Sequence, residues 1–272
     1  MRILENMRKL EVPEEIQLIV GPEEYSLNNA GMSDAEVRIY DNYVLKIQPQ
    51  DDETDNEYEM TRWLDHQVPI PAILAYSVEN GVAYTLMSRI EGKMLCAREY
   101  LEKPEQLIRL AARGLKYLWE IDVTECPHQN SRLAKRLKAA EYNVLHGLVD
   151  LDNAEPDTFG PDGFRDPEEL LEWLKNNRPE EDIVLTHGDY CLPNIFAAGE
   201  NINGFIDNGK MGPADRWQDI AIAIRSLTHN FDGMYTGGRK IYDFNQKMLL
   251  DELGIDYDKE KYRYYLLLDE LF

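Results

Sequence analysis

One short stretch, residues 183–207, limits the possible folds more than any other part of the sequence. It begins with the run Ile-Val-Leu-Thr, passes through a His-Gly-Asp triplet that ends at Asp189, and reaches Asn194. Two apolar segments then flank a Gly-Glu-Asn turn, a pattern typical of a β-hairpin. A hairpin centred between residues 200 and 201 would place Asn194 opposite Asp207. The pattern therefore predicts a loop and a hairpin that bring several oxygen-bearing side chains together.

These side chains form a set that suits phosphoryl transfer. Mg²⁺ prefers oxygen ligands and usually takes one or two carboxylates together with phosphate oxygens. An aspartate a few residues before an asparagine can orient an acceptor hydroxyl and take its proton, while the asparagine and a second aspartate hold the metal. We assign Asp189 as the catalytic base and Asn194 and Asp207 as Mg²⁺ ligands. A Gly-Asp pair alone mostly marks a turn, so the assignment depends on the whole set.

Two neighbours of Asp189 have more than one possible role. His187 could act as a metal ligand or general base, but a histidine beside a glycine in such a loop more often braces it through hydrogen bonds. Cys191 could act as a nucleophile, but no second histidine stands near it in the sequence to activate the thiol. We expect a bracing role for His187 and a small buried spacer at Cys191.

A lysine in the first part of the chain is the candidate phosphate anchor. Alternating residues predict a strand over 43–47, in which Lys46 faces away from its two apolar neighbours. The helix that follows carries Glu57 on its inward stripe, whereas Glu59 groups with Trp63. In kinases, a Lys–Glu pair of this kind holds the α- and β-phosphates. We expect Lys46 to pair with Glu57, and Glu59 is the alternative.

The rest of the first part is also predicted to be rich in strands. Residues 37–47 form a candidate hairpin that turns at Asp41-Asn42, and residues 82–88 predict another strand. Before the hairpin, segment 29–34 is short and turn-forming, and can offer backbone N–H groups and the Ser33 hydroxyl to phosphate. It lacks the GxGxxG pattern, so alone it predicts only a loop.

Helical spacing dominates from residue 104 onward. One amphipathic helix is predicted over 133–148, and another opens at Asp166, which precedes a proline and two glutamates. We therefore predict an α+β fold. Its N-terminal nucleotide-binding lobe covers residues 1–90, and its catalytic and substrate-binding lobe covers residues 91–272.

The charge balance narrows the class of ligand. The chain has 51 acidic and 29 basic residues, which gives a net charge of −22. A field of that sign repels nucleic acid and anionic membranes and attracts cations. Taken alone, the charge fits a solvated surface that keeps the protein soluble. Beside a catalytic site, it would suit a small basic substrate.

Several features bear on location. No uncharged apolar run approaches the roughly 20 residues that a membrane span needs, and the first residues carry acid where a signal peptide would be apolar. Cys96, Cys126 and Cys191 lack the spacing of a disulfide framework or a zinc site. We expect a cytoplasmic protein with no membrane, nucleic-acid or obligate protein partner.

Longer motifs carry a resemblance to a known family. They are Gly31-Met32-Ser33, Leu45-Lys46, Leu86-Met87-Ser88, the His-Gly-Asp run through Asn194, Gly204-Phe205-Ile206-Asp207, and residues 214–221 and 264–272. With these motifs the chain resembles the aminoglycoside 3'-phosphotransferases, or kanamycin kinases, over nearly its whole length. The stretches Ala-Asp-Arg-Trp-Gln-Asp and Asp-Glu-Leu-Phe are the most specific.

The resemblance implies a protein-kinase-like fold of two lobes, with a small antiparallel sheet in the first and mostly helices in the second. It also implies transfer of the γ-phosphate of ATP or GTP to a hydroxyl of an aminoglycoside antibiotic, which confers resistance. Asp189 would be the base and Lys46 with Glu57 the phosphate anchor, while Asn194 and Asp207 would bind Mg²⁺.

The same resemblance implies further contacts. Met32 and Ser33 would lie over the phosphates, and Met87 with the backbone up to Ile90 would form the adenine edge. Towards the end of the chain, Glu270 and the carboxylate of Phe272 would contact ammonium groups of the drug. Asp219 is expected to be a structural acceptor behind the catalytic loop rather than a ligand.

Some positions depart from the family pattern. Val44 stands where relatives place an aromatic ring against adenine, which leaves the choice between ATP and GTP open. Lys210 replaces an arginine and loses its bidentate fork. His229 occupies an acidic drug-contact position, and the acidic loop around Glu155 and Asp157 aligns only loosely. These changes bear on which drugs bind rather than on the chemistry.

Two other functions remain open at this point. The chain could be a kinase for another small cationic hydroxyl compound, such as an amino sugar or a choline-like amine. Choline would require an aromatic cage, whereas a polyamine requires dispersed carboxylates, which this sequence favours. It could also be a non-catalytic sensor of drug or nucleotide. The presence of Lys46, Asp189, Asn194 and Asp207 disfavours that alternative.

Overall fold

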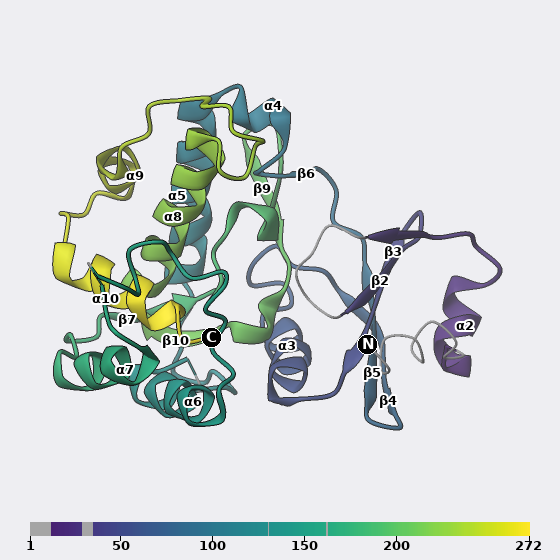
Figure 1. The fold of residues 1–272 in the computed structure, drawn as a ribbon. Helices are drawn as coiled ribbons and strands as arrows, with labels where there is room; N and C mark the ends of the chain where they lie inside the picture. Colours follow the sequence, from purple (N-terminus) through teal and green to yellow (C-terminus); the bar gives the residue numbers. More distant parts are fainter. Residues whose placement is uncertain (1–11, 29–34, 130, 162) are drawn as a thin grey trace.

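The computed structural model describes residues 12–28, 35–129, 131–161 and 163–272. A sheet-rich part and a larger helical part lie side by side (Figure 1). The sequence motif at 29–34, with Met32 and Ser33, lies outside the described residues.

A five-stranded antiparallel sheet forms the first part, in the order β1-β2-β3-β5-β4. Its strands are β1 (Ser26–Asn28), β2 (Glu36–Ile39), β3 (Tyr43–Pro49), β4 (Ile73–Glu79) and β5 (Val82–Ser88). The predicted hairpin is confirmed, because Ile39 pairs with Val44 and the Tyr40 N–H donates to the Tyr43 carbonyl at 2.9 Å. Helix α2 (Glu14–Val20) buries Ile16 against the core of this sheet.

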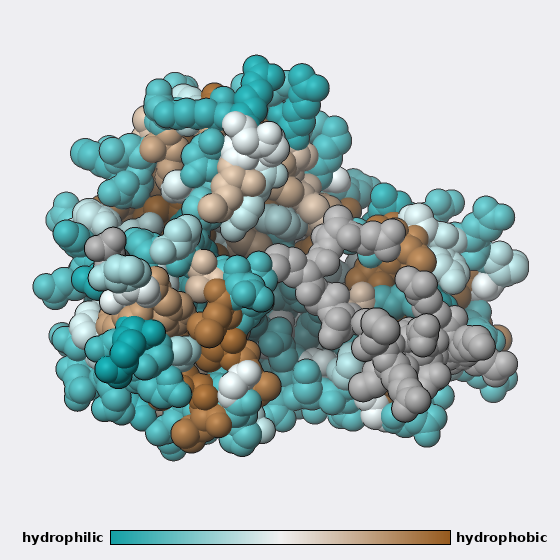
Figure 2. Space-filling model, in the orientation of Figure 1, coloured by the Kyte–Doolittle hydropathy of each residue, from teal (hydrophilic) through white to brown (hydrophobic). Residues whose placement is uncertain are grey.

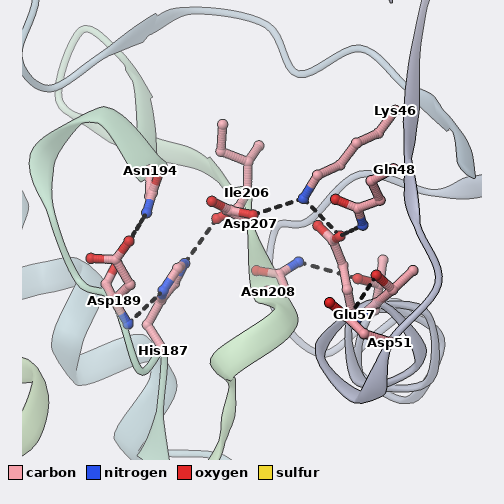
Figure 3. A network of polar contacts seen from close by, with 12 residues as sticks. Lys46, Gln48, Asp51, Glu57, His187, Asp189, Asn194, Ile206, Asp207 and Asn208 are labelled. Carbon is pink, nitrogen blue, oxygen red and sulfur yellow. Dashed lines mark hydrogen bonds and ion pairs between the residues drawn. The ribbon is translucent and has the colours of Figure 1, made fainter. Parts of the chain in front are cut away.

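Strand β3 has the alternation that the sequence predicts. Leu45 and Ile47 are fully buried in the core of the sheet, while Lys46 lies half-buried on the other face. Successive side chains of a strand point to opposite faces, so the burial of its neighbours orients the lysine. This face is the one that Lys46 shares with the side chains of the site described below (Figure 3).

Helices dominate the second part (Figure 1). They are α4 (Arg98–Leu101), α5 (Pro104–Trp119), α6 (Leu133–His146), α7 (Pro167–Asn176), α8 (Trp217–Asp232), α9 (Gln246–Leu253) and α10 (Lys259–Asp269). The helices expected after residues 104, 133 and 166 are confirmed. Helix α7 begins where predicted, since Asp166 accepts a hydrogen bond from the Glu169 N–H and a proline follows the cap.

Two small sheets position the loops of the second part. Strand β6 (Lys93–Met94) pairs with β8 (Ile195–Ala198), which pairs with β9 (Asn201–Phe205), and β7 (Ile183–Thr186) pairs with β10 (Gly212–Asp215). The short helices η1 (Leu192–Asn194) and η2 (Asn208–Lys210) lie beside them.

The predicted register of the β8–β9 hairpin is wrong. Asn194 lies opposite Ile206, whose N–H donates to the Asn194 carbonyl at 3.0 Å, and not opposite Asp207. Pairing begins at Ala198 with Asn201, and it shifts by one residue where Phe196 pairs with Gly204. A two-residue turn and a bulge on β9 therefore replace the regular hairpin that the sequence suggested.

Helix α3 (Asp52–Trp63) packs with the helical part, although the chain forms it between two strands of the sheet. Met60 and Leu64 are fully buried in the hydrophobic core that includes α5 and α8, whereas the sheet has a separate core with α2. Asp51 caps the helix by accepting from the Thr54 N–H at 2.8 Å. The helix that carries Glu57 therefore lies at the boundary between the two cores.

The face shown in Figure 2 is predominantly hydrophilic. One group of hydrophobic residues lies near the C-terminus and α6, and another lies near β3. Tyr142 and Leu145 of α6 are both exposed. Within the part of the chain that the structure describes, none of the helices is long and apolar enough to cross a membrane.

Candidate active site

A buried carboxylate holds the loop that carries Asp189. The N–H groups of His187 and Gly188 donate to the two oxygens of Asp219, at 2.6 and 2.9 Å. Burial raises the pKa of Asp219 to about 7, although these two donors favour its charged form. Gly188 has φ of 84°, and a Cβ there would meet the Lys210 carbonyl oxygen at 2.3 Å, so glycine is required. The structure confirms Asp219 as an acceptor behind the loop.

His187 spans the loop and the end of the hairpin. Its Nε2 lies 3.0 Å from the Ile206 carbonyl oxygen, and its Nδ1 lies 3.4 Å from the Asp189 N–H (Figure 3). The side chain is fully buried, and burial lowers its pKa, which favours a neutral ring. These contacts fit the bracing role rather than that of an exposed base. Burial likewise raises the pKa of the Cys191 thiol, which keeps it in the unreactive protonated form.

Asn194 fixes the position of Asp189. Its Nδ2 donates to the backbone oxygen of Asp189 at 3.1 Å and to the Asp189 Oδ2 at 3.0 Å. Asn194 is buried and sits at the end of η1, while Asp189 is half-buried. Both donor bonds use the amide nitrogen, so the amide oxygen of Asn194 stays free of this pairing.

Lys46 connects the sheet to helix α3 and to the loop that carries Asp207. Its Nζ lies 2.8 Å from Glu57 Oε2 and 2.8 Å from Asp207 Oδ1 (Figure 3). Burial alone would lower the pKa of Lys46, but the two carboxylates outweigh it and raise the pKa overall. The predicted pairing with Glu57 is confirmed, and the alternative Glu59 instead lies 2.8 Å from His128 Nε2.

Asp207 has a backbone conformation that is uncommon outside glycine, with φ of 62°. This turn points its carboxylate towards Lys46, and its other oxygen, Oδ2, takes no hydrogen bond from the residues that the structure describes. Burial alone would raise the pKa of Asp207, but Lys46 lowers it overall. An ionised Asp207 and the amide oxygen of Asn194 are hard oxygen donors, so the residues present fit Mg²⁺.

The candidate adenine edge follows two neighbouring strands. Val44 of β3 pairs with Met87 of β5, and both side chains are half-buried. Ile90 lies after β5 against the hairpin, where a Cβ on Gly204 would meet its side chain at 2.3 Å. The glycine therefore makes room for Ile90 at the junction between the two parts of the chain.

The C-terminal residues are tied to the protein by two arginines. Arg225 of α8 lies 2.5 Å from Asp269 and 3.5 Å from Glu270. Arg136 of α6 lies 3.6 Å from Asp269, and its guanidinium carbon is 4.6 Å from the ring centroid of Phe272. Neither arginine is among the site residues predicted from the sequence. Their only signal in the sequence was a basic residue interrupting an otherwise apolar helix stripe.

His229 and the acidic loop meet beside Glu270. His229 Nε2 lies 2.8 Å from Glu155 Oε1, and the Glu155 N–H donates to Glu270 Oε2 at 3.0 Å. Asp157 is exposed on the same loop. Burial first, and then the Glu155 and Asp269 carboxylates, raise the pKa of Glu270 to about 7, although Arg225 opposes the shift.

Lys210 is exposed at the end of η2. It lines a cavity of about 350 Å³ together with Phe272. Arg136 and the start of α3 form other walls of the same cavity. Two of the residues expected to contact substrate therefore face one cavity, while Glu270 is held with Arg225 and Glu155.

Comparisons with known proteins agree with this geometry. A model of the phosphotransferase enzyme family matches residues 24–254. An aminoglycoside 3'-phosphotransferase of Enterococcus faecalis is 35% identical over 98% of this chain and 100% of its own length. One from Niallia circulans is 36% identical over 96% of this chain and 97% of its own length.

Solved structures of aminoglycoside phosphotransferases have a similar fold. An aminoglycoside 3'-phosphotransferase of type VIII has a TM-score of 0.75 and 26% identity, over 92% of this chain and 94% of that one. An aminoglycoside phosphotransferase from Streptomyces rimosus, solved with ADP and streptomycin, has a TM-score of 0.74 over 94% of this chain and 95% of that one. Its identity of 23% carries the fold alone. The expected α+β, kinase-like fold is confirmed, and the chain belongs to the aminoglycoside phosphotransferase family.

Proposed function

We propose that this protein is an aminoglycoside O-phosphotransferase, which transfers the γ-phosphate of ATP or GTP to a hydroxyl of the drug. The observation that carries the proposal is the convergence of Lys46, Asp207, Asn194 and Asp189 at one place between the sheet and the helical part (Figure 3). Family membership supports the same reaction.

Asp189 would act on the acceptor hydroxyl. Asn194 holds one of its carboxylate oxygens, Oδ2, which leaves Oδ1 to accept the proton of the hydroxyl. Because the loop is fixed through Asp219 and His187, the carboxylate needs little reorganisation when the substrate arrives. Positioning of the hydroxyl for in-line attack is then the main contribution of this loop.

Lys46 would neutralise phosphate charge. Glu57 orients the ammonium group, and the same group also contacts Asp207. Mg²⁺ held by Asn194 and Asp207 would supply further positive charge to the phosphates. Met87, Val44 and the backbone near Ile90 would line the base of the nucleotide. Met32 and Ser33 would contact the phosphates, as the sequence resemblance implies.

Carboxylates near the C-terminus and on the acidic loop would bind the drug's ammonium groups. Glu270, the carboxylate of Phe272 and the exposed Asp157 are the candidates, and Lys210 would lie near the phosphate that is transferred. The net charge of −22 attracts a polycation towards all of them.

We also propose a cytoplasmic location, where ATP is available. Cys96, Cys126 and Cys191 are free thiols, which fits a reducing compartment.

A coupled assay of ADP release tests the proposal with kanamycin, neomycin and choline as acceptors. We expect ADP release with at least one aminoglycoside and none above background with choline. The Asp189→Asn variant is the matched control, because it keeps the shape of the side chain and removes the base. ADP release with choline alone would indicate a different small-molecule kinase. Nucleotide binding without ADP release from any acceptor would indicate a sensor.

A further inference from the structure

The face of α3 next to Glu57 is fastened to the loop that follows Asp207. Asn56 is 5% exposed, and its Nδ2 donates to the Gly209 carbonyl oxygen at 2.6 Å and to the Met211 carbonyl oxygen at 3.0 Å. These two carbonyls belong to the turn around η2. One side chain therefore satisfies two backbone acceptors in a different part of the molecule.

Only an amide of this size can make the pair of bonds. An asparagine amide nitrogen has two N–H donors, whereas an aspartate of the same shape has acceptors only when ionised. The Asn56 Oδ1 takes no hydrogen bond from the described residues, so the attachment depends on the nitrogen alone. The approach is also close, because a Cβ on Gly209 would meet Glu53 Cγ at 2.5 Å.

These bonds close a ring of contacts. Asn56 and Glu57 are neighbours on α3, Glu57 holds Lys46, and Lys46 holds Asp207, which directly precedes η2. The hydrogen bonds from Asn56 to the carbonyls around η2 connect this turn back to α3 and close the ring. The ring joins the sheet, the helix and the candidate magnesium loop. The contacts of Asn56 are buried, the Lys46–Glu57 pair is partly buried, and the Lys46–Asp207 pair is exposed.

We propose that Asn56 is a positioning residue for the phosphate and magnesium site. It holds α3 against the loop of Asp207, so that Glu57, Lys46 and Asp207 keep their spacing before any nucleotide is present. The inference rests on the proposed function, because it assigns Asn56 to the site where that function places the nucleotide. Asn56 acts through Glu57 and the Asp207 loop and has no proposed contact with substrate.

The Asn56→Asp variant tests the proposal. It removes both donors and places a carboxylate against two carbonyl oxygens. We expect the dissociation constant of Mg-ADP, measured by calorimetry without any acceptor, to rise about tenfold or more, and kcat to fall by a similar factor. The KM for kanamycin should change less than the dissociation constant of Mg-ADP, because Phe272 lines the same cavity as Asn56 but Glu270 and Asp157 do not. Hydrogen exchange at the amides of α3 should become faster.

Glu59→Gln is the matched control. It lies on the same helix and weakens a contact with the helical part, the one to His128, but it does not touch η2. We expect Mg-ADP affinity and kcat to stay at the wild-type values. If Asn56→Asp does not fold, Asn56→Ala removes the same donors without adding charge. It should likewise raise the dissociation constant of Mg-ADP more than the KM for kanamycin.

Wild-type affinity for Mg-ADP in a folded Asn56→Asp or Asn56→Ala variant would overturn the proposal. Equal losses in Asn56→Asp and Glu59→Gln would also overturn it, since they would point to general loosening of α3. Because Mg-ADP binding needs no aminoglycoside, the result stands even if another acceptor proves to be the substrate. Failure of the wild-type protein to bind Mg-ADP would instead contradict the proposed function itself.

Discussion

Two regions of the proposed site are built in different ways: the phosphate end, around Lys46 and Asp207, and the drug end, around Glu270. At the phosphate end, Lys46 lies 2.8 Å from a carboxylate oxygen of Glu57 and 2.8 Å from one of Asp207. At the drug end, carboxylates that would attract ammonium groups already contact bases of the protein. Glu270 lies 3.5 Å from Arg225, and Glu155 lies 2.8 Å from His229. Asp207 Oδ2 takes no hydrogen bond from the described residues, whereas both oxygens of Glu270 already have partners, which a drug would have to displace.

The two ends are expected to control different properties of the enzyme, the phosphate end the rate of the reaction and the drug end the choice of drug. Charge at the phosphate end is fixed by Lys46, whose ammonium stays protonated throughout the physiological range. Charge at the drug end depends on groups such as Glu270, with a pKa raised to about 7. We therefore expect substitutions at the phosphate end to act on kcat and nucleotide binding, and substitutions at the drug end to act on the KM for the drug.

The largest effect is expected from Asp189→Asn. Loss of a general base should lower kcat by about 10³-fold, while Mg-ADP affinity stays near the wild-type value because Asn194 and Asp207 are intact. Steady-state kinetics with kanamycin and calorimetry with Mg-ADP measure the two quantities. A variant that retained a near-normal kcat would remove Asp189 from the mechanism.

Lys46→Met should come next. The methionine keeps the length of the stem but leaves Glu57 and Asp207 without their shared cation, so kcat should fall about 10²-fold and the nucleotide KM should rise. Breaking a buried ion pair should also lower the free energy of unfolding by about 3 kcal/mol, measurable by urea denaturation. An unchanged nucleotide KM would show that Lys46 does not face the phosphates.

Glu270→Gln should give a smaller effect that depends on pH. Glu270 loses its charge as the pH falls through about 7, so its attraction for an ammonium group is present above that pH and lost below it. The ratio of kanamycin KM, variant over wild type, should rise from near one at pH 6 to about tenfold at pH 8. This ratio cancels the ionisation of the drug itself. A ratio independent of pH would exclude Glu270 from drug binding.

Val44→Phe should produce the smallest change. An aromatic ring beside Met87 adds stacking against a nucleotide base, so the KM for ATP should fall about threefold with kcat unchanged. The kanamycin KM serves as the internal control, because Val44 lies on the sheet and away from the C-terminal carboxylates. A rise in the KM for ATP would show that the base does not lie against β3.

The sequence predicted the phosphate end well because its signals are local. The period-2 pattern of β3 placed Lys46 opposite a buried face, and the helical stripe distinguished Glu57 from Glu59. The short spacing from Asp189 to Asn194 fits within a single loop. Each of these relations depends on backbone periodicity or a few residues of chain, which physical rules convert directly into geometry.

Other features depend on contacts between distant segments. The hairpin turns one residue earlier than predicted, and the bulge on β9 then moves the pairing back by one position. Gly204 signals an irregular strand, but a glycine alone does not give the register. The pairing of Arg225 with Asp269 and of His229 with Glu155 joins segments that the sequence does not order in space. Deletion of residues 270–272 would not separate drug binding from stability. It would also remove Leu271, which is fully buried, so point substitutions are the better test.

Binding of ADP with and without Mg²⁺, compared between Asp207→Asn and Asp189→Asn, separates the metal ligand from the catalytic base. Calorimetry without an acceptor isolates the phosphate end. We expect Asp189→Asn to keep the gain in ADP affinity that Mg²⁺ gives the wild-type protein, and Asp207→Asn to lose most of it. Equal gains in the two variants would contradict the assignment of Asp207 to the metal and of Asp189 to the hydroxyl.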